Sequence, residues 1–264
     1  MRHIYRFELR RNLRPLLVWG LCLAGLVCMG YMEFTFVFRS NADVTAIMDA
    51  LPPQLSVLLG ITAHVDFSTA PGFFCLMADF AFYALSAYAI LLGTGMLARE
   101  EEERTADFLY ARPCARGEVL AGKWLAGLTC CFLLSLLSVL VSALTFGAAA
   151  PGLAMAAAAW GAGLLFTQSL YFSAGALIAA FCRRPGRASV LSLLLLAATI
   201  FAGKFLAMAG IAGGPALAVS PRDYFPVERW LYGGGFGLWP WLLAGGGAAA
   251  LFAAALGRYR RKDL

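Results

Sequence analysis

Charged residues are scarce in this sequence. Asp, Glu, Lys and Arg make up 14% of its 264 residues, whereas they make up roughly 25% of a soluble globular domain. Hydrophobic residues make up 61% of the chain, and its mean hydropathy is +0.75. This balance excludes a soluble globular protein and indicates a protein that crosses a membrane several times.

Residues that build metal, disulfide and catalytic sites are also few. The two histidines, His3 and His64, lie outside the apolar runs, which disfavours a metal site. None of the seven cysteines falls within residues 34–71 or 210–237, the two long segments between apolar runs, so we expect no disulfide framework. The sequence has no His-Glu-x-x-His or Gly-x-Gly-Asp pattern, and this disfavours an intramembrane enzyme.

What the chain does have is six long apolar runs, and a helix needs about 20 such residues to cross a bilayer. The runs do not alternate apolar with polar residues, which favours helices over barrel strands. They are Leu16–Tyr31, Phe73–Leu97, Trp124–Phe146, Leu153–Phe181, Ala188–Ala209 and Leu238–Leu256. The sequence therefore predicts an all-α membrane protein with six transmembrane helices, forming one domain over residues 1–264.

Basic residues predict the topology. Most of the 21 lysines and arginines fall within residues 2–14, 99–123, 183–187 and 258–262, which six spans place on one side. Basic loops face the cytoplasm, so we expect both termini to be cytoplasmic, residues 34–71 and 210–237 to be external, and the protein to lie in the cell membrane, the inner membrane of a bacterium. Topology accounts for the net charge of +6, so no nucleic-acid partner is needed.

The basic residues before the first run recur at helical spacing, as Arg2, Arg6, Arg10 and Arg14 show. This spacing predicts a helix over residues 1–15 that lies in the inner membrane interface and leads into the first span. The alternative is a basic topology signal with no further role.

The polar stretch Ala98–Lys123 joins the second and third runs, and we call it the elbow. A helical wheel separates a charged side from a second side. The charged side holds Glu100, Glu103, Arg104 and Asp107, and the second side holds Thr105, Phe108 and Leu109. Pro113 then breaks the helix. One alternative is an ordinary charged loop, but the positive-inside rule does not require four consecutive glutamates, so we favour a surface that contacts a cytoplasmic partner.

The elbow also carries an ordered set of motifs. An acidic cluster is followed by a threonine-acid-leucine helix, a proline-arginine turn and a Gly-Lys pair. These are Glu100, Glu101, Glu102 and Glu103, then Arg104–Leu109, then Pro113–Arg116, then Gly122-Lys123. In this order they resemble the membrane-spanning subunits of type-2 ABC exporters. The sequence departs from that family's pattern at Arg104, Asp107 and Ala115, where glycine, glutamate and serine are usual.

The resemblance implies that the elbow is a coupling helix and that the ATPase is a separate polypeptide. The chain itself then needs no cofactor, because ATP and Mg²⁺ bind the ATPase. Its expected partners are ABC ATPase subunits, the lipid bilayer, and a second copy or a homologous permease that completes the pathway. The resemblance suits export of an amphipathic drug, peptide or lipid. The alternative is a self-sufficient secondary transporter, which would need inverted repeats and ion-coupling residues near the membrane midplane.

The resemblance assigns contact with the ATPase to one set of elbow residues. They are Glu100, Glu101, Glu102, Glu103, Arg104, Thr105, Asp107, Phe108, Leu109, Pro113 and Arg116.

Part of the elbow also resembles a phosphate-binding loop. Gly117–Lys123 matches the P-loop pattern up to its last position, where Trp124 replaces the Ser or Thr that ligates Mg²⁺. No strand precedes this run, and we expect it to be a helix entering the membrane. The chain is therefore not expected to hydrolyse ATP.

Two ionisable residues, Asp79 and Lys204, lie within the apolar runs. Both are predicted at similar depth in the outer leaflet, where an unpaired charge is costly. We hypothesise that they face the protein interior and pair with each other. The alternative is that each reaches the outer interface separately.

Overall fold

The computed structural model describes residues 2–39, 46, 50–52, 55–57, 65–102, 116–150, 152–182, 184–211 and 219–260. Within these ranges the regular structure is helical, without strands. Six helices are long and apolar enough to cross a membrane. They are α1 (Arg2–Glu33), α4 (Ala70–Glu102), α6 (Arg116–Thr145), α7 (Leu153–Phe181), α8 (Pro185–Met208) and α11 (Leu238–Arg260). The predicted all-α fold with six spans is confirmed.

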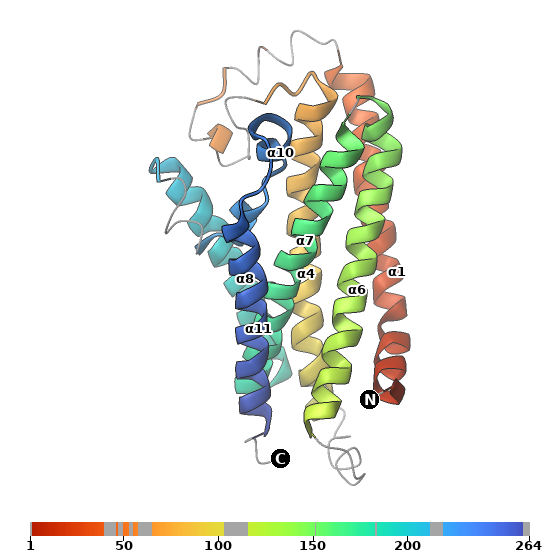
Figure 1. Ribbon diagram of the computed structural model, residues 1–264, viewed down its shortest axis with the longest axis vertical. Coiled ribbons are helices and arrows are strands. Elements are labelled where there is room, and N and C mark those ends of the chain that lie inside the picture. The colour runs from red at the N-terminus through yellow and green to blue at the C-terminus, as the bar shows by residue number, and fades with distance from the viewer. Residues whose placement is uncertain are drawn as a thin grey trace.

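The long helices run side by side along the longest axis of the molecule (Figure 1). Both chain termini lie at one end of this bundle, which we call the terminal end, and we call the opposite end the loop end (Figure 1). Even numbers of spans bring the termini together. The end of α4 at Glu102 and the start of α6 at Arg116 also lie at the terminal end (Figure 1).

Helices α4 and α7 form the centre of the bundle. In the apolar part of each span, 61% of the residues of α4 and of α7 are buried inside the protein, compared with only 22% of those of α8 and of α11. Gly93 and Gly175 let the two central helices meet, because a Cβ on either residue would collide with the other helix's backbone. Small residues at helix crossings provide van der Waals packing where lipid supplies no hydrophobic force.

The first helix is longer than its predicted span. Residues 2–14 are helical as predicted, but α1 continues through Pro15 to Glu33 without the boundary expected between an interface helix and the first span. A π-helical turn, η1 (Phe34–Phe38), then extends it. Phe34 and Phe38 are buried there against Phe73, with ring centroids 5.6 and 4.9 Å away. This aromatic packing explains why the helix outlasts the apolar run.

Short elements close the loop end: η2 (Phe146–Ala148), η3 (Pro221–Tyr224) and α10 (Val227–Gly233). Phe225 lies between the last two and packs on Trp241 and Phe236, with ring centroids 4.5 and 5.3 Å away. These aromatic side chains thus pack against one another. They hold Phe225 and Phe236 against Trp241 of α11.

The start of α4 is capped by the residues just before it. The Asp66 carboxylate accepts hydrogen bonds from the Ser68 backbone N–H at 2.9 Å and from the Ser68 hydroxyl at 2.7 Å. The Thr69 hydroxyl donates to the Asp66 carbonyl at 2.7 Å and accepts from the Gly72 N–H at 3.3 Å. The Thr69 hydroxyl thereby satisfies an N–H group that the first helical turn leaves unpaired.

Candidate functional site

The elbow begins where α4 leaves the apolar part of its span. That apolar part ends at Leu97, and the helix continues to Glu102. The backbone of Glu100, Glu101 and Glu102 therefore forms the last turn of α4. The third span's helix, α6, begins at Arg116. The other residues predicted to contact an ATPase lie outside the described residues: Glu103, Arg104, Thr105, Asp107, Phe108, Leu109 and Pro113.

The P-loop-like run is helical, as predicted. Residues Arg116 to Lys123 form the first two turns of α6. Lys123 points into the bundle, where its residue is 2% exposed. A lysine that is buried in a helix is not positioned as a phosphate-binding loop requires.

Lys123 joins three helices at the terminal end. Its ammonium group donates a hydrogen bond to the Met96 carbonyl oxygen of α4 at 2.7 Å. The same nitrogen lies 3.6 Å from Oε1 of Glu8 in α1. The side chains of Lys123 and Glu8 are 3% and 5% exposed. We call this the three-helix contact, made by Glu8, Met96 and Lys123.

An apolar cluster at the same end connects α4 and α6 to the remaining helices α7, α8 and α11. It contains residues from α4, α6, α7, α8 and α11 that are buried against one another. Its buried members are Leu97, Leu120, Ala176, Ala179, Ala188 and Tyr259. Buried hydroxyls add a second link between α4 and α8, because Thr94 and Ser192 share a hydrogen bond of 2.7 Å. Near the two ends of the elbow, α4 and α6 thus contact α7, α8 and α11 through this cluster and α1 through Glu8.

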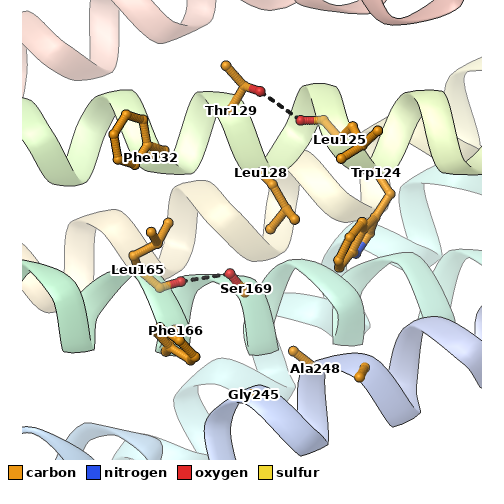
Figure 2. A pocket seen from close by; sticks show the side chains of 11 residues that line it. Trp124, Leu125, Leu128, Thr129, Phe132, Leu165, Phe166, Ser169, Gly245 and Ala248 are labelled. Carbon is orange, nitrogen blue, oxygen red and sulfur yellow. Dashed lines mark hydrogen bonds between the residues drawn. The ribbon is translucent and has the colours of Figure 1, made fainter. Parts of the chain in front are cut away.

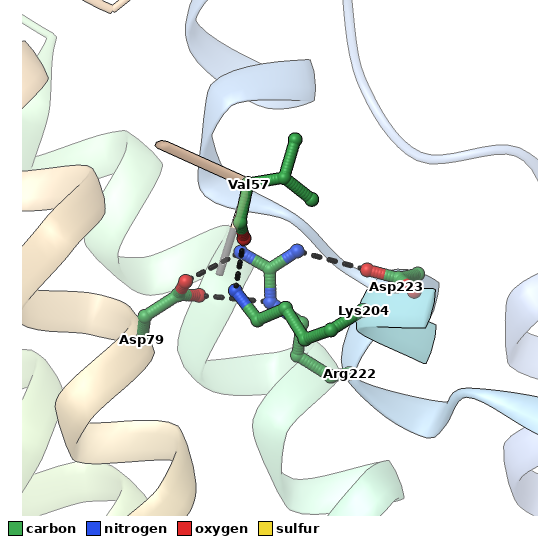
Figure 3. A network of polar contacts seen from close by, with 5 residues as sticks. All are labelled: Val57, Asp79, Lys204, Arg222 and Asp223. Carbon is green, nitrogen blue, oxygen red and sulfur yellow. Dashed lines mark hydrogen bonds and ion pairs between the residues drawn. The ribbon is translucent and has the colours of Figure 1, made fainter. Parts of the chain in front are cut away.

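A network of partly buried charges lies at the loop end (Figure 3). Arg222 of η3 makes a two-pronged contact with Asp79 of α4, through Nε to Oδ1 at 3.1 Å and through Nη2 to Oδ2 at 2.5 Å. Its third nitrogen, Nη1, donates to Asp223 at 2.9 Å. Paired bonds between a guanidinium and a carboxylate are both strong and directional. Arg222 therefore attaches the segment before α11 to the second span.

The structure does not show the hypothesised ion pair between Asp79 and Lys204. Asp79 has Arg222 as its ion-pair partner, and Lys204 donates a hydrogen bond to the Val57 carbonyl at 3.2 Å (Figure 3). Lys204 does face the interior, as predicted, since the residue is 7% exposed. The sequence does not predict the Asp79–Arg222 pair, because Arg222 belongs to a segment that the sequence places outside the membrane.

The titrating groups near Arg222 respond to this burial. Burial by itself lowers the pKa of the Arg222 guanidinium, but the carboxylates of Asp79 and Asp223 raise it well above its ordinary value. Burial also raises the pKa of the Glu228 carboxyl in α10, and the positive charge of Arg222 opposes that rise. Arg222 is thus a permanent positive charge at the centre of an acidic neighbourhood.

An apolar groove opens between α6, α7 and α11 (Figure 2). Its volume is about 450 Å³, and its walls include Trp124, Phe132 and Phe166. The hydroxyls of Thr129 and Ser169 donate to carbonyl oxygens of their own helices at 2.8 and 2.7 Å. These bonds are visible in Figure 2. The groove is therefore suited to an apolar chain or ring.

Sequence reasoning missed two functional candidates, Glu8 and Arg222. Glu8 is the one acidic residue among the arginines of residues 2–14, and that exception was a usable signal. Arg222 carried no such signal, because only the folded chain brings η3 to α4.

Comparison with known families agrees with this architecture. The model of a family described as "ABC-2 family transporter protein" matches residues 2–219, which is most of the chain. No curated protein matches the chain with significant similarity.

Proposed function

Because this chain belongs to the ABC-2 family of transporter proteins, we propose that it is the permease subunit of an ABC exporter driven by a separate ATPase. Two copies, or this chain and a homologous permease, form the pathway. One ATPase subunit docks on each elbow at the terminal end, which is the cytoplasmic side. ATP and Mg²⁺ bind the ATPase.

The acidic end of α4 is the observation that carries this proposal. The C-terminus of a helix bears a partial negative charge, so carboxylates there are unfavourable. Glu100, Glu101 and Glu102 nevertheless occupy the last turn of α4, beyond the apolar part of its span. A basic surface on a docked ATPase offsets this repulsion through charge-assisted hydrogen bonds. These glutamates thus serve docking, although they lower the stability of the last turn of α4.

The packing of the terminal end supports transmission from the elbow. Lys123 ties α6 to α4 at the Met96 carbonyl, and Leu97 and Leu120 join the apolar cluster of the other spans. A displacement of the elbow therefore moves α4 and α6 together. Since α4 packs along α7 through Gly93 and Gly175, the central pair of helices moves as well.

The surface of the bundle supports an amphipathic substrate. The groove between α6, α7 and α11 has apolar walls and a volume of about 450 Å³, within the range of small-molecule sites. The groove is open to the surface of the bundle rather than enclosed. We propose that the apolar part of a drug, peptide or lipid enters the pathway from such a membrane-facing groove.

The first experiment is purification of the tagged chain from its native membrane, followed by mass spectrometry of the proteins that co-purify. We expect a stoichiometric ABC ATPase. Charge reversal of Glu100, Glu101 and Glu102 to Lys should remove the ATPase while the permease still elutes as a folded protein. The matched control is Glu33→Lys, an exposed glutamate at the loop end, which should retain it. Retention by the triple variant would contradict the proposal.

A further inference from the structure

The contact between α1 and the base of the elbow is electrostatic and buried. Glu8 of α1 lies 3.6 Å from the Lys123 ammonium, which also donates to the Met96 carbonyl of α4. The neighbouring Asn12 side chain is fully buried and donates to the Glu8 carbonyl at 2.8 Å. Three helices therefore meet at a single ammonium group.

Stability alone does not explain a buried pair of this kind. Removing two charges from water is costly, and apolar residues of similar volume stabilise a protein equally well or better. Buried charges in membrane proteins are by default functional. An ion pair instead specifies how the helices are aligned, because the two charges lie close together in only one relative position of the helices. The three-helix contact therefore defines how α1 sits against α4 and α6.

The location of the contact relates it to the elbow. Met96 lies just before the elbow and Lys123 is its last residue. The apolar cluster at this end is built from α4, α6, α7, α8 and α11. Helix α1 packs Tyr5 and Leu9 against the larger apolar core, and it adds a second polar contact to α6, because the Tyr5 hydroxyl shares a hydrogen bond of 3.1 Å with Thr129. At this end, two directional polar contacts therefore link α1 to α6.

We propose that Glu8 and Lys123 are positioning residues that make α1 move together with α4 and α6 when the ATPase moves the elbow. This inference rests on the proposed function. Without the pair, α1 loses its alignment and no longer follows the other two helices. The elbow then still moves α4 and α6, but the movement does not reach the first span.

The test uses the complex of permease and ATPase from native membranes, reconstituted in phospholipid nanodiscs. Nitroxides are attached to unnatural amino acids at Leu13, Glu118 and Ala254, which are exposed positions of α1, α6 and α11. The 13–118 pair spans the three-helix contact. The 118–254 pair measures the distance between α6 and α11, and α11 takes no part in the three-helix contact. Pulsed electron paramagnetic resonance measures both distances without nucleotide and with a non-hydrolysable ATP analogue.

Three variants are compared with the wild type. Glu8→Gln removes the negative charge of α1 that lies 3.6 Å from the Lys123 ammonium group. The double variant Glu8→Leu with Lys123→Met replaces the pair by apolar side chains, so it stays folded even where the single variant does not. Arg10→Gln is the control, because it removes an exposed charge from the same helix.

In the wild type and in Arg10→Gln, the nucleotide should shift the 118–254 distance and leave the 13–118 distance unchanged. In Glu8→Gln and in the double variant, the 13–118 distance should become nucleotide-dependent. A merely structural pair predicts that the double variant keeps a fixed 13–118 distance, and that result would overturn the inference. A nucleotide-dependent 13–118 distance in the wild type would also overturn it. An unchanged 118–254 distance in the wild type would contradict the proposed function itself.

Discussion

Replacing Arg222 by methionine measures how strongly its ion pairs hold the loop end on the bundle. The side chains of Arg222 and Asp79 are 14% and 17% exposed. Removal of one partner of a buried pair costs about 3–5 kcal/mol, and the partial exposure lowers the expected loss to about 3 kcal/mol. Arg222→Met leaves the carboxylates of Asp79 and Asp223 without their guanidinium. Its effect should therefore exceed that of Asp79→Asn, in which Arg222 keeps Asp223 at 2.9 Å.

The assay is thermal unfolding of the purified protein in detergent, followed by tryptophan fluorescence. For a chain of this size, a loss of about 3 kcal/mol lowers Tm by about 6–12 °C. Asp79→Asn should lower Tm by about half as much. The double variant should lose less than the sum of the two single variants, because the two residues contact each other.

The control for this prediction is Arg229→Gln, which removes an exposed positive charge from α10. It should change Tm by little, since exposed charges contribute about 1 kcal/mol or less. The reasoning would be refuted if Arg222→Met lost no more stability than Arg229→Gln. It would also be refuted if the effects of Asp79→Asn and Arg222→Met were strictly additive.

Three further predictions concern single positions. Thr69→Ala should destabilise the protein by about 1 kcal/mol because the Gly72 N–H of α4 loses the hydroxyl that caps it, which hydrogen exchange in the first turn of α4 can detect. Gly175→Leu should lower the yield of folded protein in size-exclusion chromatography, because its side chain collides with the backbone of Ile90 and overpacking costs about 1–3 kcal/mol. Burial raises the pKa of Glu228, so the contribution of Glu228 to folded stability should be fully present below the ordinary glutamate pKa and should be lost as pH rises through the raised value. Glu228→Gln should remove that component from a series of Tm measurements between pH 4 and pH 8, roughly the range over which a shifted carboxyl titrates.

The spans could be predicted from sequence because bilayer thickness sets the length of an apolar helix. The fourth span coincides with α7, Leu153–Phe181, at both ends. Each of the others extends beyond its apolar run at one end or both, as α4 does to Glu102 and α11 does to Arg260. Hydropathy detects where a chain enters lipid, whereas a helix continues into water as long as its backbone hydrogen bonds are formed.

The partners of buried charges could not be predicted in the same way. Depth along the spans placed Asp79 and Lys204 at one level, but depth carries no information on which faces of two helices meet. Arg222 reaches Asp79 because η3 packs on the bundle, a long-range arrangement. Lys123 was read as part of the elbow, and its contact with Glu8 depends on how α1 packs along α6.

Photo-crosslinking from the elbow is the most direct test of the central claim that a separate ATPase docks on Ala98–Lys123. Benzoylphenylalanine replaces Glu101, and the control position is the exposed Tyr232 of α10 at the loop end. Irradiation of intact membranes should yield an adduct between position 101 and an ABC ATPase, and position 232 should yield none. The account is contradicted if position 101 gives no ATPase adduct in membranes where the assembled transporter is active, or if position 232 gives the same adduct.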